Sequence, residues 1–552
     1  MPLLSLPATI EGTALSPRSQ SFLHNMYNIR GVLVTREGYE RTDKYDEDSR
    51  PATADDRIGR GLMVSADGEK MYCIFGKSVY TTVFVSGVLK IGTAIFTNAS
   101  FLSPEYTTLS YAVGFTGIAI AGGTTQDADN NNLFINTTTD VCTALTDTDL
   151  PIAKSVEYLN GKYIWMAADG TSVYWSEIDD AGNIDPLSFF DAESRPDPNK
   201  EQAVIGNDYY VLGSRSVERF SDVGTTAAPF IRATNSSLAV GYVGGLIRLS
   251  DRIVFIGRRV GGGLGVYEMN GSSITEISND SVREMLNCPL SANLQEINTT
   301  TGNGGIDEAV AQSFNSYGAE IYTFIINHIT LYCMAAGDGY QWGFLGDQAD
   351  SGTFPSRDWG VYDWSHDPTG TTDPFNRLFR FVGHTSFKGN WYCQRSIDID
   401  DAGLFIKSTN RLTVNVDTSE STWYITRGAR FALRSDEDRD FNFSRLELVY
   451  SKQGVNRVSV QTTNPTGGDS TDTVSLRVSN TGVGWGYISG SSGDSDGQSW
   501  SDRLEEPYGN LGDSGRLEFR ASGGLSSGDG YIGIVLESKS EIPLTIEKVI
   551  VS

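Results

Sequence analysis

Short apolar runs separated by small polar residues dominate this chain. The runs are about five to eight residues long, and Gly, Asn, Asp and Ser stand between them. Helical periodicity is confined to residues 279–287 and 306–314; in the second stretch Ile306, Val310 and Phe314 recur every four residues. The pattern therefore predicts an all-β protein with two short helices.

Between residues 55 and 410 the apolar runs come in pairs, each joined by a small polar turn. Some are apolar on both faces, as at 163–166 and 321–326, which fits strands buried between stacked sheets. The pairs start roughly 40 to 65 residues apart, close to the length of a propeller blade. They are LMVSADGEKMYCIF, YAVGFTGIAIAGG, KYIWMAADGTSVYWSEI, DYYVLGSRSVERFSDV, RIVFIGRRVGGGLGVYEM, AEIYTFIINHITLYCMAA and RLFRFVGHTSFKGNWYCQ. We expect a degenerate β-propeller over 51–415, with stacked β-sandwiches as the alternative.

After residue 415 apolar and polar residues alternate cleanly. The apolar positions are Leu446 and Leu448; Val458 and Val460; Val474, Leu476 and Val478; Leu517 and Phe519; and Ile532, Ile534 and Leu536. One buried and one wet face predict a C-terminal antiparallel β-sandwich over 416–552, with long loops at 481–501 and 521–530. Residues 1–50 are too polar for a separate domain. They are predicted to be an N-terminal arm, or a strand donated elsewhere.

The charge is strongly acidic. The 552 residues include 69 acidic and 43 basic residues, giving a formal charge of −26. Because phosphate contacts require Lys and Arg, this balance argues against a dedicated binder of nucleic acid or anionic membranes. The densest basic feature is only the pair Arg258-Arg259.

The cysteines and the chain start indicate a protein that folds in a reducing compartment without secretion. The five cysteines form no C-x-x-C motif and are predicted to be buried thiols. They are Cys73, Cys142, Cys288, Cys333 and Cys393. Residues 1–12 lack the charged and apolar regions of a signal peptide. The most apolar stretch, Ile321–Gly337, carries Asn327 and His328 at its middle and is predicted to form two strands instead of a membrane span.

No catalytic template is complete. The histidines His24, His328, His366 and His384 are far apart, and none has a metal-ligand spacing. There is no G-x-S-x-G motif for a serine hydrolase. The run Gly261–Gly265 lacks the lysine and helix of a nucleotide loop, and Gly76–Ser78 has Met71 where a P-loop needs glycine. We therefore predict no catalytic and no cofactor-binding residues.

Acidic clusters are better explained as solvated turns than as metal or sugar sites. Asp398, Asp400, Asp401 and Gly403 begin like an EF-hand loop, but Ala402 and Thr409 occupy ligand positions; Asp127, Asp129 and Asn131 lack the glycine. Asp67-Gly68 and Asp169-Gly170 resemble the Asp-box turns of sialidase propellers, but Glu69 and Thr171 replace a glycine. Asp-Gly is also a favoured hairpin turn. We predict no metal site and no enzymatic activity.

The blade motifs nevertheless resemble a known family. The central residues that carry the resemblance are Asn160–Tyr163, Asp169–Thr171, Tyr174-Trp175, Phe189–Asp197 and Gly213–Glu218. A later block contains Gln312–Phe314, Tyr317-Gly318, Ile321-Tyr322, Leu331-Tyr332 and Gln341-Trp342. The start of the chain adds Asn25–Tyr27 with Gly31 and Gly38. Over about residues 20 to 410 the chain is similar to the packaged-DNA stabilisation proteins of short-tailed bacteriophages, which form the tail hub or nozzle.

The resemblance implies a structural virion protein without an active site, made in the cytoplasm of the host bacterium. Such hubs form a ring, usually of six copies, below the portal and its adaptor. They extend the DNA channel, retain the packaged genome and carry tail spikes, fibres or a needle. It implies no cofactor and no membrane insertion, and DNA that passes through without specific binding.

Two other functions stay open at this point. A carbohydrate- or receptor-binding propeller module of the tail would expose aromatic platforms on its loops. A polysaccharide depolymerase would need a carboxylate pair in a cleft at the blade axis, which a sequence with 69 acidic residues cannot single out.

Overall fold

The described part of the chain is built almost entirely of strands. A computed structural model describes residues 59–287, except 76–77, 86–87, 98–108, 123–131, 193–196, 225–228, 234–237, 260 and 272. Outside that range it describes the strands named below and residues 30–31, 306 and 309. This composition confirms the all-β prediction. No described helix is long and apolar enough to cross a membrane.

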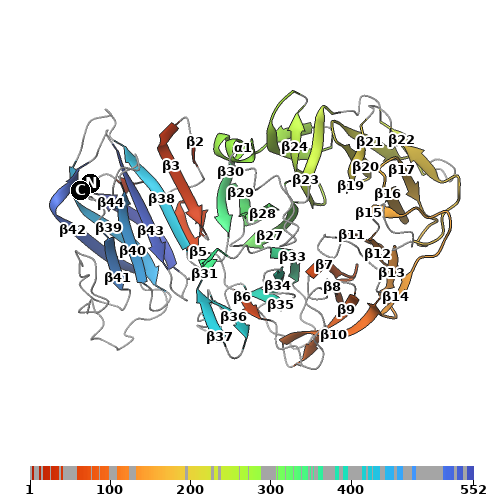
Figure 1. The fold of residues 1–552 in the computed structure, drawn as a ribbon, viewed down its shortest axis with the longest axis horizontal. Coiled ribbons are helices and arrows are strands. Elements are labelled where there is room, and N and C mark those ends of the chain that lie inside the picture. Colours follow the sequence, from red (N-terminus) through yellow and green to blue (C-terminus); the bar gives the residue numbers. More distant parts are fainter. Residues whose placement is uncertain are drawn as a thin grey trace.

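Four-stranded antiparallel units stand around a common axis as the blades of a propeller (Figure 1). The first strand of each blade contacts the first strand of the next, and the last blade contacts the first, so that the ring is closed. The described strands form seven such blades. The propeller prediction is confirmed, and the alternative of stacked sandwiches is wrong.

Each blade begins at the axis and ends at the periphery. Blades one to three contain β7 (Gly59–Val64), β8 (Met71–Phe75), β9 (Ser78–Val85) and β10 (Val88–Thr97); β11 (Ser110–Val113), β12 (Gly117–Ala121), β13 (Leu133–Asn136) and β14 (Val141–Ala144); and β15 (Ala153–Leu159), β16 (Lys162–Ala167), β17 (Ser172–Trp175) and β18 (Phe189–Asp191). Blades four and five contain β19 (Asn199–Ile205), β20 (Asp208–Gly213), β21 (Val217–Asp222) and β22 (Phe230–Arg232); and β23 (Val240–Arg248), β24 (Ile253–Arg259), β25 (Leu264–Asn270) and β26 (Ser273–Glu276).

The last two blades recruit strands from elsewhere in the chain. Blade six is β27 (Val310–Ser316), β28 (Ala319–Ile326), β29 (Ile329–Ala336) and β30 (Gly339–Leu345); blade seven is β33 (Asp358–Trp364), β34 (Phe379–His384), β35 (Asn390–Arg395) and β6 (Tyr39–Arg41). A small hairpin, β31 (Gln348–Ala349) with β32 (Gly352–Thr353), lies between them in sequence. Each of the seven sequence motifs falls in a different blade, so the motifs mark the blades one by one.

The apolar core lies between neighbouring blades. In β16, Tyr163 and Trp165 pack against blade two, whereas Ile164 and Met166 pack against blade four, and all four are fully buried. Both faces of a blade are thus interior, which explains why consecutive positions of this strand are apolar. The Asn160-Gly161 turn before β16 has φ angles of 51° and 86°, as the two central residues of a type I′ hairpin turn require.

The N-terminal arm supplies strands to several sheets. Its strands are β1 (Leu3–Leu4), β2 (Glu11–Thr13), β3 (Ser16–His24), β4 (Met26–Ile29), β5 (Val32–Thr35) and β6. β6 pairs with β35 and completes blade seven. β3 lies between β30 of blade six and β38 (Arg427–Arg434), and so continues the blade-six sheet into the C-terminal region. The predicted boundaries at residues 50 and 415 stay predictions.

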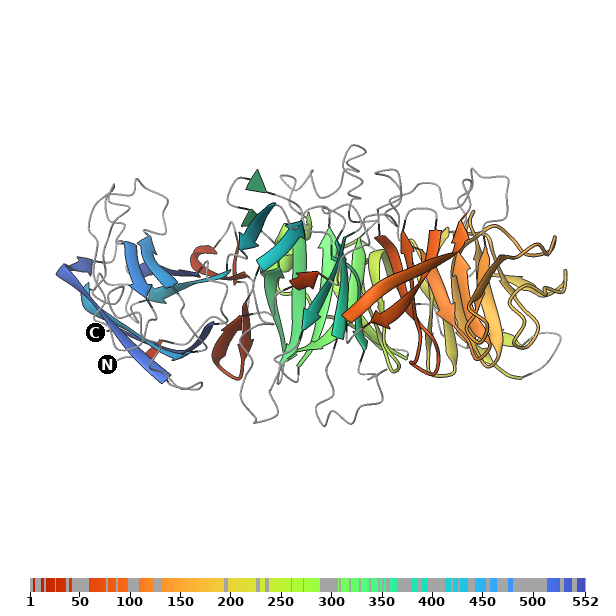
Figure 2. The same cartoon turned by 90° about the horizontal axis from the view of Figure 1, so that it is seen from below.

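The C-terminal sheets form the predicted sandwich to one side of the ring (Figure 2). Their strands, after the hairpin β36 (Thr413–Asp417) and β37 (Glu420–Tyr424), are β38, β39 (Asn442–Lys452), β40 (Arg457–Thr463), β41 (Ser475–Ser479), β42 (Ser514–Ser526), β43 (Tyr531–Ser538) and β44 (Leu544–Val551). One sheet has the order β3-β38-β43-β40-β41 and the other β4-β5-β44-β39-β42. Residues 521–526, predicted as loop, belong to β42, whereas 481–501 lie outside the described residues.

Of the two predicted helices, one is confirmed and one is wrong. Helix α1 (Asp280–Asn287) begins after Asn279, whose side chain accepts a hydrogen bond from Val282 N at 2.9 Å. Ile306–Phe314 instead leads into β27, where Val310, Gln312 and Phe314 are buried alternately. A spacing of four residues is an even number, so it fits a strand of period two as well as a helix.

The apolar stretch 321–337 is a hairpin, as predicted. Ile326 at the end of β28 pairs with Ile329 at the start of β29, and the two strands belong to blade six. The buried strands of a propeller are apolar for the same reason as a membrane segment, because neither meets water.

We predict that Tyr27 anchors the arm to blade six. Its ring is fully buried and meets Tyr332 edge-on at 5.2 Å, while the Tyr332 hydroxyl donates to Met26 O at 2.6 Å. Tyr27→Ala should cost about 3–5 kcal/mol because it leaves a cavity. Urea unfolding and hydrogen exchange in residues 16–35 measure this. The matched control Tyr27→Phe, which keeps the ring, should cost much less; equal behaviour of both variants would contradict the anchor.

Candidate functional site

The two candidate histidines in the described part of the chain lie in different sheets. His24 lies in β3 and His384 ends β34, whereas His328, His366 and the acidic clusters at 127–131 and 398–403 lie outside the described residues. Within the described part of the chain, no three His, Cys, Asp or Glu side chains are grouped so as to hold a metal ion. Gly261 sits in the turn between β24 and β25 with φ of 76°.

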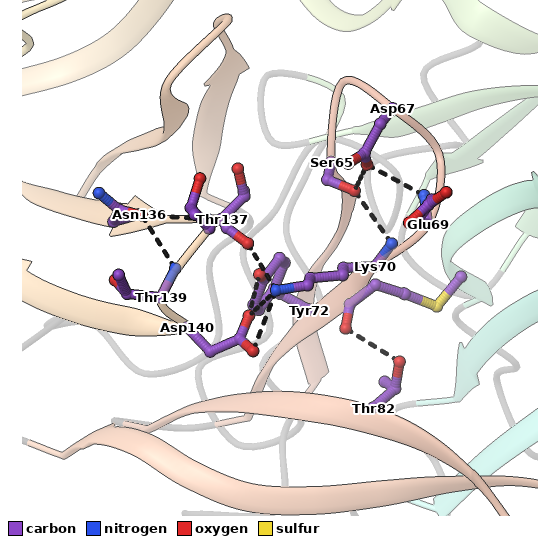
Figure 3. Close-up of polar contacts among 12 residues, drawn as sticks. Ser65, Asp67, Glu69, Lys70, Tyr72, Thr82, Asn136, Thr137, Thr139 and Asp140 are labelled. Atoms are coloured by element: carbon purple, nitrogen blue, oxygen red, sulfur yellow. Dashed lines mark hydrogen bonds and ion pairs between the residues drawn. The ribbon is translucent and has the colours of Figure 1, made fainter.

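Both Asp-Gly pairs are hairpin turns whose carboxylates are used locally. Asp67 accepts hydrogen bonds from the Ser65 hydroxyl and from Glu69 N, the latter at 3.1 Å (Figure 3). These bonds, the one from Ser65 above all, hold the pKa of Asp67 below its usual value. Asp169 accepts from Thr171 N at 2.9 Å. The glycine that follows each aspartate has φ near 75°, at 76° and 74°.

A polar network joins blade one to blade two (Figure 3). Lys70, at the start of β8, reaches the carboxylate of Asp140 at 3.0 Å and Thr137 O at 2.6 Å. The Tyr72 hydroxyl donates to the same carboxylate at 2.6 Å, and burial together with this bond raises the pKa of Tyr72. Asn136 caps the receiving turn by accepting from the backbone N of Thr139 at 3.0 Å. The network fixes the relative position of two blades.

Three charged side chains meet on the first strands of blades three, four and five, at the inner side of the ring. Arg248 of β23 donates to Glu157 of β15 and to Glu201 of β19, the latter at 3.3 Å. It also donates to Gln202 O at 3.1 Å. Gln202 in turn donates to Ile164 O at 3.0 Å. One guanidinium therefore ties three consecutive blades together. We call Glu157, Glu201 and Arg248 the inner charge cluster.

Burial governs the electrostatics of this cluster. Glu157 is only 8 % exposed, and loss of water raises its pKa to about 7, although Arg248 opposes the shift. For Arg248 burial acts in the lowering direction, but the two carboxylates outweigh it and hold its pKa above the ordinary value. A buried carboxylate of this kind costs stability unless its cation is in place. The arrangement holds blades together and contains no nucleophile next to a base.

A second arginine joins blade five to blade six. Arg252 donates to the Tyr322 hydroxyl at 2.9 Å and pairs with Glu320 of β28. It also lies 3.5 Å from Glu268, which accepts a hydrogen bond from the Tyr340 hydroxyl at 2.7 Å. Like the inner charge cluster, these side chains connect neighbouring sheets.

The sequence did not single out these residues. Glu157 and Arg248 are 91 residues apart, and the chain has 69 acidic residues from which to choose. The only local signal is a glutamate next to Val156 and Leu159 in a strand that is otherwise largely buried.

The block that carried the family resemblance has a structural role. Asp197, which precedes β19, accepts hydrogen bonds from Arg215 N at 2.7 Å and from the Ser216 hydroxyl at 3.1 Å. A Cβ on Gly213 would lie 2.5 Å from the Asp197 carboxylate, so glycine at this position leaves room for the carboxylate. The aspartate therefore braces the turn between β20 and β21. Residues 193–196 lie outside the described part of the chain.

The described cysteines are structural thiols. Cys73, Cys142 and Cys333 are buried and unpaired with one another. Burial raises the pKa of the Cys142 thiol to about 12 and the pKa of the other two well above the ordinary value, which keeps them protonated.

One family model matches the chain. Residues 33–302 match the phage stabilisation family, described as bacteriophage P22 Gp10, beta-propeller. The match begins within β5 and ends after α1, so it spans blades one to five and the Asp197 turn. A search of curated proteins finds no match.

Solved structures are similar to the chain at a low level, and three of them serve as examples. They are the N-terminal domain of Nup159 (8% identity, TM-score 0.36, covering 67% of this chain and 98% of that one), an auxiliary nutrient binding protein from Bacteroides thetaiotaomicron (12%, 0.32, 61% and 68%), and YCF48 bound to D1 peptide (12%, 0.34, 72% and 99%). Likeness at this level carries no inference about the chain.

We predict that Glu157 makes stability fall as the pH rises. The unfolded chain releases this proton near pH 4.5, whereas the folded chain keeps it until about pH 7. The folded state thus binds more protons in this window. Raising the pH from 5 to 8 should therefore lower the free energy of unfolding by roughly 1–3 kcal/mol through this group. In Glu157→Gln this pH-dependent part of the free energy of unfolding should vanish.

Denaturant unfolding at pH 5 and pH 8 measures the difference. Glu69→Gln, at an exposed turn of blade one, is the control and should follow the wild type. If Glu157→Gln shows the same pH dependence as the wild type, the carboxyl is not the group that titrates.

Proposed function

Over residues 33–302 the chain belongs to the packaged-DNA stabilisation family of bacteriophages, and from this premise we propose that it is the hub of a short phage tail. Family membership supports a role as a tail protein and a component of the virion. We propose more specifically that the protein extends the DNA channel below the portal and adaptor. In that position it retains the packaged genome and carries spikes, fibres or a needle during genome ejection.

The observation that carries the proposal is the match of the family model to the propeller. Two features of the molecule support a mechanical role. The ring of blades is closed, and arginine contacts connect blades three to six. A closed ring resists deformation because each sheet is held between two others. Such a body suits a component that must keep its shape while DNA moves past it.

We further propose that the chain is not an enzyme and works through partners. The partners are further copies of itself in a ring, six in number, the portal-adaptor complex and the tail appendages. The protein is made in the cytoplasm of the host bacterium and does not insert into membranes.

Assembly on the portal tests this proposal. Purified chain mixed with portal-adaptor complex should add a mass of about six times 60.0 kDa, measured by mass photometry. The chain without the complex is the control and should stay in smaller species. A protein that remains monomeric and never joins the complex would contradict the proposal.

We predict that the protein retains DNA by closing the channel and not by gripping phosphates. Each copy carries a net charge of −26, which repels a duplex over a Debye length of about 8–10 Å. Fluorescence anisotropy with a labelled duplex should detect no binding at physiological salt and little at low salt. A basic DNA-binding protein serves as the positive control. Tight binding with a steep salt dependence would reject the repulsive channel.

A further inference from the structure

The exposed large apolar side chains gather at one end of three consecutive blades. We call the end where the first strand of a blade passes into the second the turn end. Phe115 lies in the β11–β12 turn, Ile178 in the β17–β18 loop and Val223 directly after β21, all at the turn end of blades two to four. Phe115 is 82% exposed and Ile178 is 64% exposed.

The outer strands of the same blades add further apolar residues. An antiparallel fourth strand starts at the turn end, and Val141, Phe189 and Ile231 stand at or next to the starts of β14, β18 and β22. Leu187, 80% exposed, precedes Phe189 by two residues. These seven residues, here called the apolar rim, are all of the large apolar side chains that are exposed in the described residues.

Hydrogen bonds tie the turns of the three blades into one surface. The Thr116 hydroxyl, next to Phe115, donates to Asp179 O at 3.2 Å. Asp179 N donates to Gly161 O at 2.6 Å. Asn160 then donates through its side chain to the Asp222 carboxylate at 2.8 Å, next to Val223. Because these bonds connect blades two, three and four in series, the apolar rim is a preformed surface.

Carboxylates surround this surface. Glu177, Asp180 and Asp185 are exposed in the β17–β18 loop, and within the described residues none of them forms an ion pair with Lys or Arg. Lys162 is the base that follows the neighbouring Asn160-Gly161 turn. Asp140 is paired with Lys70, whereas Asp179 and Asp222 accept hydrogen bonds from the neutral side chains of Tyr158 and Asn160. The apolar rim therefore has a negative border.

We propose that the apolar rim is a docking surface for a different protein, one that presents apolar side chains bordered by Lys and Arg. Monomeric proteins rarely leave a large apolar patch exposed unless it meets a partner. A second copy docking through the same surface would bring carboxylates against carboxylates, which costs binding energy. Nucleic acid is disfavoured by the same charges. Blades two to four also lie on the side of the ring away from the C-terminal sheets (Figure 1).

The proposal rests on the proposed function in one respect, because the partner is sought among the other proteins of the same tail. The test measures binding of the purified chain to each of these proteins by biolayer interferometry at low and high salt. Phe115→Ser combined with Ile178→Ser and Leu187→Ser removes apolar contacts. Glu177→Lys combined with Asp180→Lys reverses the border. Asp169→Lys makes the same type of charge change at the opposite end of blade three and is the matched control.

We expect one non-identical tail protein to bind the wild type and the Asp169 control equally. Both rim variants should weaken that binding at least tenfold, and the charge variant should also lose its salt dependence. The docking surface would be overturned if the rim variants bind the tail protein as tightly as the wild type does. It would also be overturned if the wild type binds only to itself and the rim variants lose that self-association. Circular dichroism shows whether each variant is folded.

A second arm separates this inference from the proposed function. Phe115 is replaced by the photo-crosslinker p-benzoylphenylalanine, and crosslinks are mapped in infected cells. A wild-type chain absent from purified virions contradicts the tail function whatever the crosslinks show. In that case the docking surface is supported if position 115 crosslinks to a non-identical protein that has Lys or Arg beside its apolar contact. It is overturned if position 115 crosslinks only to a second copy of the chain or to nothing.

Discussion

Each blade of this molecule has two apolar faces, and the whole structure depends on covering both. A sheet such as β15–β18 has buried side chains on either side, so it is stable only between two neighbours. A row of such sheets always leaves two faces open at its ends, and closing the row into a ring removes them. The contact of β33 with β7 closes the ring, so that each blade is covered by a neighbour on both of its apolar faces.

The N-terminal arm takes part in closing the ring. Blade seven takes its fourth strand from β6, which precedes blade one in sequence, so the last sheet cannot be completed without the first part of the chain. β3 then extends blade six toward β38, although within the described residues its ladder to β30 consists of the single pair His24 and Phe344. The buried ring of Tyr27 adds side-chain packing where backbone pairing is sparse.

Charges between blades add specificity to a core that is otherwise apolar. Apolar packing alone is tolerant of small shifts, whereas an arginine that pairs with a buried carboxylate such as Glu157 must meet it in one geometry. Arg248 and Arg252 lie on or just after β23 and reach in opposite directions, the first to blades three and four and the second to blade six. These contacts between sheets make the ring rigid, which is in keeping with the channel role proposed above.

The sequence by itself determined the local structure and the family. Period-two patterns predicted the strands, the seven paired motifs corresponded to the seven blades, and the helical pattern over 279–287 corresponded to α1. The Phe189–Glu218 block carried the resemblance to the family whose model matches residues 33–302. These features depend on neighbours along the chain, which a sequence displays directly.

Only the tertiary structure decided which segments meet. It placed 39–41 in blade seven, made 310–316 a strand despite its four-residue spacing, and paired Glu157 with Arg248 across 91 residues. It also gathered Phe115, Ile178 and Val223 at one end of three blades. Such contacts are set by the packing of whole sheets around a closed ring, and no local pattern of residues carries that information.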